Sequence, residues 1–543
     1  MAQMNSLLLN ASFSSYRGYL IGLLVVLLIA NGIRFYRLTN DCLNEPEGYS
    51  IVLASLPTDQ YLPHIRQGDI VPSIYPIILR QWYSLGKVLR HLFLPTELKR
   101  EYEKQEIFTM QAPWTKSFWE WTLKPEAFWG RLFSLLFGLG SIILLYFIGK
   151  KMVNDWVGLI SAILLALSPT HIRISREITL YSVQLFILLG IFLSYLWLIN
   201  GGNKFNRNKQ MTVLLSFIVC GILGILIHLS SMIFIFLLFL WAVVSKKNNP
   251  FLYITFFFVF LIGFSWDYYW KYPLLAFVPS DYNEPVLGWE NSLMALGFLD
   301  VFIIKSEYIQ VFSKTIILIS LATGFTFSLR KLRQISPASC NPVLFLYYQA
   351  LGMFLLFYIV NSIMGFTESR EWIIYLIPFV CLILSVGFDN FPILNWKYRL
   401  IVLILILDTS YIHSLYFSRP LIPFRNIANR LNTEVRPLDR VIVLPNNSAY
   451  VFDYYFQKPR FRMSLNTQSE FTSFIDIIQK NVPRVWLIRF PFGSLHSEEL
   501  NLIKQLNTIS RAHDIHYAIW NPVLVTVTLY EMNPIEKSLV SNQ

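Results

Sequence analysis

The chain has 543 residues, of which 55% are hydrophobic, 16% aromatic and only 14% charged. This charged fraction is far below that of soluble domains, so the composition excludes an ordinary soluble protein and indicates a polytopic membrane protein. The formal net charge is +12, but much of it falls in short loops between apolar stretches. No soluble segment carries the basic patch that nucleic-acid binding requires, so no nucleic-acid partner is expected.

Eleven apolar stretches are candidates to cross a bilayer as helices, which takes roughly 20 residues per crossing. The expected spans are 18–35, 128–148, 156–167, 180–199, 211–227, 230–244, 252–270, 311–329, 344–363, 372–387 and 400–416. The first stretch is too long for the apolar core of a signal peptide, so it is expected to remain as an anchor.

The loops between these spans alternate in charge. If the N-terminus is cytoplasmic, every inner loop is basic, as the positive-inside rule requires. The inner loops then carry Lys150, Lys151, Lys204, Arg207, Lys209, Lys246, Lys247, Arg330, Lys331, Arg333, Lys397 and Arg399. An odd number of crossings from the cytoplasm places the polar segment after residue 416 on the outer side.

We therefore expect a polytopic α-helical membrane protein with about eleven transmembrane helices and a small C-terminal extramembrane α/β domain. Residues 1–417 would form the transmembrane domain and residues 418–543 the outer domain, which is long enough to bury its own core. The outer domain is expected to hold helices at 426–431 and 498–510, and strands at 440–444, 485–488, 517–520 and 523–530.

The first outer loop, 38–127, contains an amphipathic stretch at 74–94 with apolar residues at helical spacing. Two interpretations of this helix stay open. It lies along the membrane surface, or it packs on the outer ends of the spans. A second, highly charged helix is expected at 97–106.

Three carboxylates follow the first span: Asp41, Glu45 and Glu47. An acid beside the membrane is costly unless it faces water or a partner, so these residues are candidates for function. One carboxylate placed against an acceptor hydroxyl or amine would act as a general base. The alternative interpretation is a set of solvated loop acids.

Cations gather on the side where the positive-inside rule disfavours them. The outer turn 168–182 holds His171, Arg173 and Arg176, and a lipid phosphate is a natural partner because arginine donates several hydrogen bonds to phosphate oxygens. The alternative partner is Glu177, through an ion pair. Further cations on this side are Arg34, Arg37, Arg131 and Arg370. Snorkelling explains each singly, whereas the collection favours a polyanionic lipid. His228 is interpreted as a hydrogen-bonded packing residue, and the four cysteines as free thiols.

A resemblance to a known family rests on two groups of residues: Arg131-Leu132-Phe133-Ser134 with Gly138 and Tyr146, and Leu167-Ser168-Pro169-Thr170-His171-Ile172 followed by Ser175-Arg176-Glu177 and Tyr181. These resemble the signature of the dolichyl-phosphate-mannose protein mannosyltransferase and ArnT-like group, which are C-type membrane glycosyltransferases (GT-C, glycosyltransferase family 39 type). The resemblance is close over residues 18–245. Over the later spans it extends only to the architecture, and over the C-terminal tail it is weak.

The resemblance implies transfer of a sugar from a polyprenyl-phosphate carrier to an acceptor at the outer face, with an acid of the first outer loop as the base. In many members this loop carries an Asp-Glu pair followed by a small residue and Tyr. Here Glu47, Gly48 and Tyr49 align, but Pro46 stands where the aspartate is usual. Thr179 likewise stands where relatives often carry arginine, and Arg176 replaces a glutamine.

The predicted function is therefore a polyprenyl-phosphate-sugar-dependent glycosyltransferase (hexosyl or pentosyl transferase) of the bacterial inner (plasma) membrane. Glu47, or failing that Glu45, would be the base. The donor phosphate would bind Arg173, Arg176, Arg370 and Arg131, where donors stabilise the developing charge. Other substrate contacts are predicted for Asp41, Tyr49, Glu177, Tyr181 and His171.

The expected partners are the polyprenyl-phosphate sugar, a lipid, protein or polysaccharide acceptor, and membrane lipids. No cofactor is predicted; no residue spacing requires a metal, and a divalent metal requirement stays open. The competing class is a lipid-binding scaffold or a transporter of lipid-linked sugars that has lost the aspartate. A transporter would carry ionisable residues deep within its spans, and these spans are nearly free of charge.

Overall fold

The computed structural model describes residues 2–36, 38, 43–56, 73–93, 125–201, 207–228, 230–245, 250–271, 342–364, 371–390, 424–436, 438–444, 451–452, 454–456, 484–490, 497–518 and 524–532. The chain divides into two compact units. The first comprises Met1–Leu38, Leu56–Arg80 and Gly130–Ser418, and the second Thr39–Ser55, Gln81–Trp129 and Arg419–Gln543. Each unit is described by itself.

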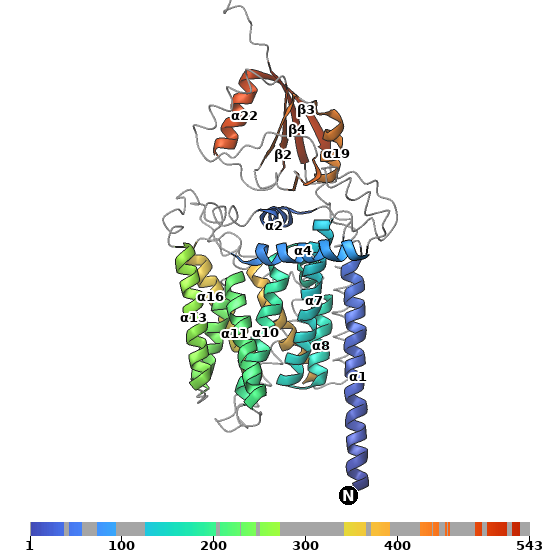
Figure 1. Cartoon of the computed structure of the whole chain (residues 1–543), viewed down its shortest axis with the longest axis vertical. Coiled ribbons are helices and arrows are strands. Elements are labelled where there is room, and N and C mark those ends of the chain that lie inside the picture. The colour runs from blue at the N-terminus through green and yellow to red at the C-terminus, as the bar shows by residue number, and fades with distance from the viewer. Residues whose placement is uncertain are drawn as a thin grey trace, which may run out of the picture. The chain divides into compact units, whose positions relative to one another are not determined.

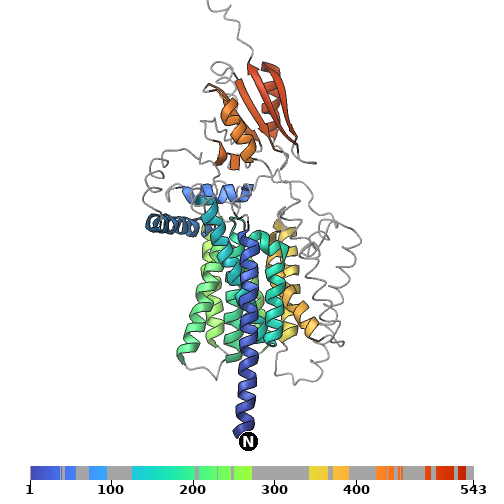
Figure 2. The ribbon, with the colours of Figure 1, turned by 90° about the vertical axis from the view of Figure 1, so that its right-hand side faces the viewer.

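The first unit is built from apolar helices that run side by side (Figures 1 and 2). They are α1 (Ala2–Phe35), α7 (Pro125–Met152, which begins in the second unit), α8 (Asp155–Leu167), α9 (Pro169–Ile174), α10 (Leu180–Gly201), α11 (Arg207–Ile227), α12 (Ser230–Val244), α13 (Pro250–Lys271), α16 (Pro342–Met364), the 3-10 helix η2 (Glu371–Leu376) and α17 (Ile377–Asp389). Helices thus occur at nine of the expected spans, and the spans 311–329 and 400–416 lie outside the described residues.

Four helical segments of the described chain are long and apolar enough to cross a bilayer: Arg17–Phe35, Ala127–Met152, Leu180–Ile199 and Asn208–Ile227. Shorter apolar helices cover Asp155–Leu167, Ser230–Val244, Leu252–Gly263 and Ile374–Asp389. Helices satisfy their own backbone hydrogen bonds, which is what an apolar solvent demands. The chain is an integral membrane protein with a polytopic helical fold.

Helix α8 occupies a central place because it contacts both α1 and α17. It begins where the Asn154 side chain accepts a hydrogen bond from the Val157 amide at 2.8 Å, a standard N-cap that satisfies one orphan donor. Within the apolar core the Ser161 and Ser385 hydroxyls lie 3.0 Å apart and link α8 to α17. Helix α8 stops at Ser168, because the following proline disfavours a helical residue before it.

The second unit contains a four-stranded sheet in the order β1-β2-β4-β3. Strand β1 (Arg440–Leu444) runs parallel to β2 (Arg484–Arg489), while β4 (Leu524–Met532) is antiparallel to both β2 and β3 (Ser510–Ala518). Helices α19 (Phe424–Glu434) and α22 (Ser497–Ile509) lie beside the strands (Figure 1). The central residues of β1 and β2 are apolar and buried, as expected for strands covered on both faces.

Sequence patterning predicts most of this sheet but misplaces β3. A strand is expected at 517–520, and the observed strand begins seven residues earlier, at Ser510. Its pairing with β4 runs from Ser510 opposite Met532 to Ala518 opposite Leu524. The segment is rich in polar residues and lies at one end of the described strand order, and cross-strand pairing with β4 holds it in the sheet despite its weak apolar signal.

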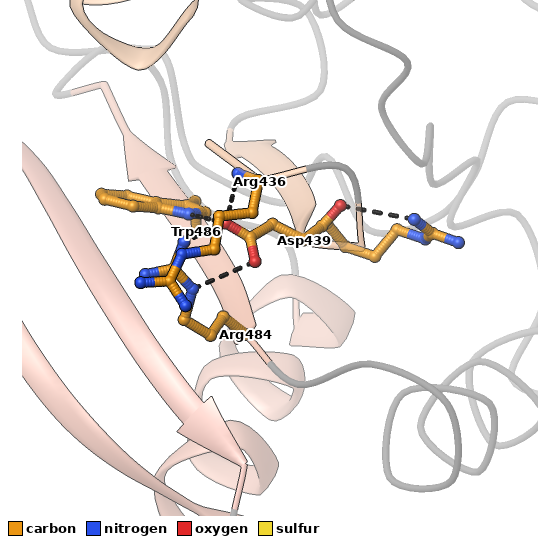
Figure 3. A network of polar contacts seen from close by, with 5 residues as sticks. Arg436, Asp439, Arg484 and Trp486 are labelled. Carbon is orange, nitrogen blue, oxygen red and sulfur yellow. Dashed lines mark hydrogen bonds and ion pairs between the residues drawn. The ribbon is translucent and has the colours of Figure 1, made fainter. Parts of the chain in front are cut away.

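A buried carboxylate joins the first two strands (Figure 3). Asp439 accepts hydrogen bonds from Arg484 Nε at 3.0 Å and Nη2 at 2.6 Å, from the Arg436 amide at 2.8 Å and from Trp486 Nε1 at 2.9 Å. Burial raises the pKa of Asp439, but these hydrogen bonds and the charge of Arg484 outweigh it, so the net pKa is lowered. The carboxylate is a structural tie between the turn before β1 and the start of β2.

Two further helices belong wholly or mainly to the second unit. Helix α4 (Tyr75–Phe93) forms at the predicted amphipathic stretch, and Leu85, Val88 and Leu92 are exposed on it. Helix α2 (Glu45–Ser55) contains two of the three predicted carboxylates. The predicted helix at 97–106 lies outside the described residues.

Candidate active site

The predicted site residues fall into both units, and the basic group belongs to the first. Its core is the short helix α9, at a place where the sequence predicts only a turn. Pro169 stands at its first position, where a missing amide costs nothing. The Ser168 hydroxyl lies 3.5 Å from the His171 amide at the start of this helix. The helix carries His171 and Arg173, and Arg176 follows directly after its end.

Arg34, at the end of α1, is the most deeply buried cation of this group, with no exposed surface. Its Nη1 donates to the carbonyls of Ala30 at 3.1 Å and Ala166 at 2.9 Å, and its Nη2 lies 2.8 Å from Nδ1 of His171. From the sequence, Arg34 is predicted to be among the cations that face an anionic lipid. The structure instead places it between α1 and the end of α8, where it satisfies the Ala166 carbonyl, which no further helical turn would satisfy.

The arginine also fixes the chemical state of His171. Because a guanidinium can only donate, Nδ1 of the imidazole must accept, so the neutral ring carries its proton on Nε2. Burial is the main cause that lowers the pKa of His171 well below its usual value, and the charge of Arg34 adds to it, while the Leu165 carbonyl acts in the opposite direction. His171 is therefore neutral at physiological pH and belongs to the packing of the α8–α9 corner.

Two more arginines hold the chain just after α1. Nη1 of Arg131 donates to the Leu38 carbonyl at 2.7 Å, and Nη2 of Arg176 donates to the Tyr36 carbonyl at 3.1 Å. Both side chains are buried, with 4% and 9% of their surfaces exposed. Cations at the C-terminal end of a helix are favourable because the last carbonyls carry partial negative charge.

Arg173 differs from these three arginines. Its side chain is half-buried, and its Nε is a buried atom with no hydrogen-bond partner in the described part of the chain. A buried donor of a charged group is costly when it is unpaired. Among these four arginines, Arg173 is the one whose side chain makes no hydrogen bond to a carbonyl within the described residues.

The motif residues that carry the family resemblance also meet here. Gly138 of α7 lies so close to the Ser175 hydroxyl that a Cβ at this position has no room. The same hydroxyl donates to the His171 carbonyl at 2.6 Å, and the Ser182 hydroxyl donates to the Ser134 carbonyl at 2.6 Å. These residues pack α7 against α9 and the start of α10 and so hold the basic turn in place.

In the second unit Glu47 belongs to a capping box. Its Oε2 accepts a hydrogen bond from the Asn44 amide at 3.0 Å, and the Asn44 Oδ1 accepts one from the Glu47 amide at 2.9 Å. This reciprocal arrangement closes the N-terminus of α2, with Asn44 as the N-cap. Pro46 fits the first turn, where its missing amide is harmless. Glu47 is buried, with 1% of its surface exposed.

The remaining predicted residues are placed as follows. Glu45 begins α2, Tyr49 lies one turn further and is half-buried, and Glu177 and Tyr181 are half-buried in and after the turn that follows α9. Asp41 and Arg370 lie outside the described residues. His228 lies 2.9 Å from the Ser230 hydroxyl through Nδ1, which agrees with the predicted packing role.

Sequence reasoning missed the structural partners Asn44 and Tyr455. The Asn44-Glu45-Pro46-Glu47 run before an apolar stretch is a readable capping-box signal. Tyr455 accepts a hydrogen bond from the Leu43 amide over a separation of 412 residues, which no local pattern reveals. Across the described ranges no group of three or more His, Cys, Asp or Glu side chains is arranged to hold a metal ion.

Comparison with known proteins agrees with the motif resemblance. The family model described as dolichyl-phosphate-mannose-protein mannosyltransferase matches residues 114–270. No curated protein matches the sequence. The resemblance expected from the motifs is thereby confirmed at the level of the family model.

Solved structures of ArnT share the fold at low sequence identity. ArnT from Cupriavidus metallidurans bound to undecaprenyl phosphate matches with a TM-score of 0.55 at 12% identity, over 94% of this chain and 98% of that one. Its apo state matches with the same TM-score at 11% identity and the same coverage. The archaeal oligosaccharyltransferase AglB from Archaeoglobus fulgidus gives a TM-score of 0.47 at 10% identity, over 88% of this chain and 70% of that one.

Proposed function

We propose, from the premise that this chain is a GT-C membrane protein resembling the dolichyl-phosphate-mannose protein mannosyltransferases and ArnT, that it transfers a sugar from a polyprenyl-phosphate donor to an acceptor. The transfer takes place at the outer face of a bacterial inner membrane, with the N-terminus in the cytoplasm and residues 418–543 outside. The donor sugar is a hexose or a pentose, and the acceptor is a lipid, a protein or a polysaccharide.

The observation that carries this proposal is the basic turn on α9. Arginines from α1, α7 and the α9 turn converge at one end of the apolar helices, and most of their recorded hydrogen bonds go to backbone carbonyls. Arg173 adds a buried Nε without a partner in the described chain. An anion at this position removes the cost of that unpaired donor, and a lipid phosphate supplies one at the membrane surface.

The proposed reaction is a nucleophilic displacement at the anomeric carbon of the donor sugar. An acceptor hydroxyl or amine attacks the anomeric carbon, its proton passes to the carboxylate of Glu47, and the bond between that carbon and the phosphate oxygen breaks. The phosphate leaves with an added negative charge, which Arg173, Arg176, Arg131 and Arg370 stabilise. Preorganised donors at developing charge are worth about 10²–10³ in rate.

The other predicted residues serve the substrates. Tyr49, Asp41, Glu177, Tyr181 and His171 are proposed to line the sugar and acceptor positions or to hold the residues that do. Glu45 is the second choice for the base. The ArnT structure with bound undecaprenyl phosphate supports a carrier of this chemical type, since its fold is shared over nearly the whole chain.

The test is turnover by the full chain reconstituted in liposomes. The protein is incubated with a panel of labelled polyprenyl-phosphate sugars and a membrane extract as acceptor source, and release of the free carrier phosphate is measured. Binding of each donor is measured in parallel by co-purification of the label. The test variant is Arg173→Gln, which keeps a polar side chain but removes the guanidinium charge.

We expect release of the carrier from at least one donor, and a loss of about 10²–10³ in rate for Arg173→Gln. Donor binding without release in every acceptor mixture would show that the protein is a lipid-binding scaffold and not a transferase. Movement of intact donor across the bilayer without release would replace it by a transporter. If no donor is bound and no carrier is released, the proposal is refuted.

A further inference from the structure

The C-terminal segment that holds Val451 and Tyr455 packs, through these two residues, against the start of the helix that carries Glu47. Both belong to the second unit, although about 400 residues separate them. The Tyr455 hydroxyl accepts a hydrogen bond from the Leu43 amide at 3.0 Å, and both residues are buried. Leu43 is the residue just before the N-cap Asn44, so this bond holds the entry of α2.

A second contact lies one turn into α2. A Cβ placed on Gly48 would stand 2.7 Å from Cγ2 of Val451, 3.0 Å from its amide nitrogen and 3.2 Å from its Cα. Real Cβ atoms essentially never approach so closely, so only glycine lets the two backbones meet here. Val451 itself is completely buried. The position after Glu47 is therefore shaped to fit the C-terminal segment.

Tyr455 is itself held from three sides within the second unit. The guanidinium of Arg425 lies 5.4 Å from its ring centroid, the ring of Tyr454 packs edge-on at 5.1 Å, and Asn432 Nδ2 lies 3.4 Å from its carbonyl oxygen. Two of these partners come from α19. The hydroxyl that receives the Leu43 amide is thus fixed by the core of the C-terminal domain.

We propose that the C-terminal domain is a positioning element for the candidate base, and that Tyr455 and Gly48 are the residues through which it acts. The capping box sets where Glu47 points relative to α2, and Tyr455 sets where the start of α2 stands. The catalytic part of this inference rests on the proposed glycosyl transfer. A displacement of about 1 Å at a reacting group is enough to cost about 10²-fold in rate.

The test uses the full-length protein with Tyr455→Phe, which removes the accepting oxygen and keeps the ring. The matched control is Tyr530→Phe, which removes another hydrogen bond of this unit, the 3.0 Å contact between the Tyr530 hydroxyl and Asn507 Oδ1. Two quantities are measured for each variant: hydrogen exchange of peptides spanning residues 43–55, and kcat and KM for carrier release.

We expect faster exchange at the start of α2 and a roughly 10-fold or larger fall in kcat for Tyr455→Phe, with KM for the donor unchanged. Tyr530→Phe is expected to change neither. Unchanged exchange in Tyr455→Phe would overturn the contact as a positioning device. Faster exchange with wild-type kcat would overturn its role in transfer. Absence of turnover in the wild-type protein would instead remove the proposed function, while the exchange measurement still decides the contact.

A second pair of variants guards against a general loss of folding. Gly48→Ala is expected to lower kcat because its new methyl group collides with Val451. Combining it with Val451→Ala removes the atom 2.7 Å away and is expected to restore part of the rate, since the backbone contacts remain. No recovery in the double variant, at equal amounts of inserted protein, would contradict the proposal.

Discussion

The basic group of the first unit and the carboxylate of the second unit are both buried, but they close helix ends of opposite kind. Arg34, Arg131 and Arg176 donate to carbonyls at the ends of α8 and α1, whereas Glu47 accepts from the amide that begins α2. Each charge therefore has a structural task. A charged residue near a suspected site is therefore a candidate for chemistry only if it has hydrogen-bonding groups that this structural task does not use.

By that criterion Arg173 and Asp439 are opposite cases. Arg173 has a buried Nε without a recorded partner, while Asp439 accepts four hydrogen bonds from its own unit. The comparison predicts that substitutions of the helix-closing residues act mainly on stability. Arg173→Gln and Glu47→Gln should act mainly on rate, because Arg173 closes no helix end and glutamine keeps the capping hydrogen bond of Glu47.

The largest stability effect is expected for Arg34→Met. This substitution leaves the Ala166 carbonyl and the His171 Nδ1 without their donor in the protein interior, and each such group costs about 1–3 kcal/mol. We expect the free energy of unfolding to fall by about 3 kcal/mol, as measured by thermal unfolding of the purified protein in detergent. The control is Arg17→Met, on an exposed stretch of the same helix. Equal effects of the two substitutions would contradict the assigned role of Arg34.

Asp439→Asn tests the fully satisfied carboxylate and is expected to cost about 2 kcal/mol, since charge-assisted bonds to Arg484 are lost. Because the pKa of Asp439 is lower in the folded state than in the unfolded chain, its stabilisation is complete above about pH 4. It is lost as the pH falls through the folded pKa.

Hydrogen exchange of β1 and β2 at neutral and acidic pH measures this effect. The wild-type strands should lose protection at acidic pH by more than those of Asp439→Asn. The control Glu434→Gln breaks the ion pair between Arg430 and Glu434, whose side chains are 53% and 33% exposed, respectively. Its loss should cost less than about 0.5 kcal/mol. A pH dependence that is identical in Asp439→Asn and wild type would refute the role of this carboxylate.

The smallest effect is expected for Asn44→Ala, because an N-cap is worth about 1 kcal/mol. The substitution should speed hydrogen exchange in the first turn of α2 and leave the rest of the second unit unchanged. Asn44→Ser keeps a capping oxygen and should exchange as the wild type does. Equal protection of α2 in the alanine and wild-type proteins would show that the capping box contributes nothing.

The sequence predicts those parts of the fold that depend on local pattern. Apolar stretches form helices at nine expected spans, and strand β1 has the expected bounds because its five residues are bounded by turn-forming neighbours. The sequence misplaces strand β3, because its polar residues are held in the sheet by pairing with β4 and carry little apolar signal of their own.

The site is predicted less completely than the fold. The motif around Ser168 and His171 identifies the basic corner, and a regular pattern of capping residues around Asn44 is also readable. The burial of Arg34 is not, because an arginine at the end of a span looks the same whether it snorkels to headgroups or closes a neighbouring helix. The contact of Tyr455 with Leu43 depends on the tertiary fold alone.

The most direct test of the account is carrier release by Glu47→Gln beside the wild-type protein in the same liposomes. Glutamine also serves at this position of a capping box, so the helix and the hydrogen exchange of α2 should be preserved while the base is lost. We predict a rate lower by about 10²–10⁴, the usual contribution of a general base. A wild-type rate in Glu47→Gln, with α2 intact, would contradict the assignment of Glu47 and with it the proposed mechanism.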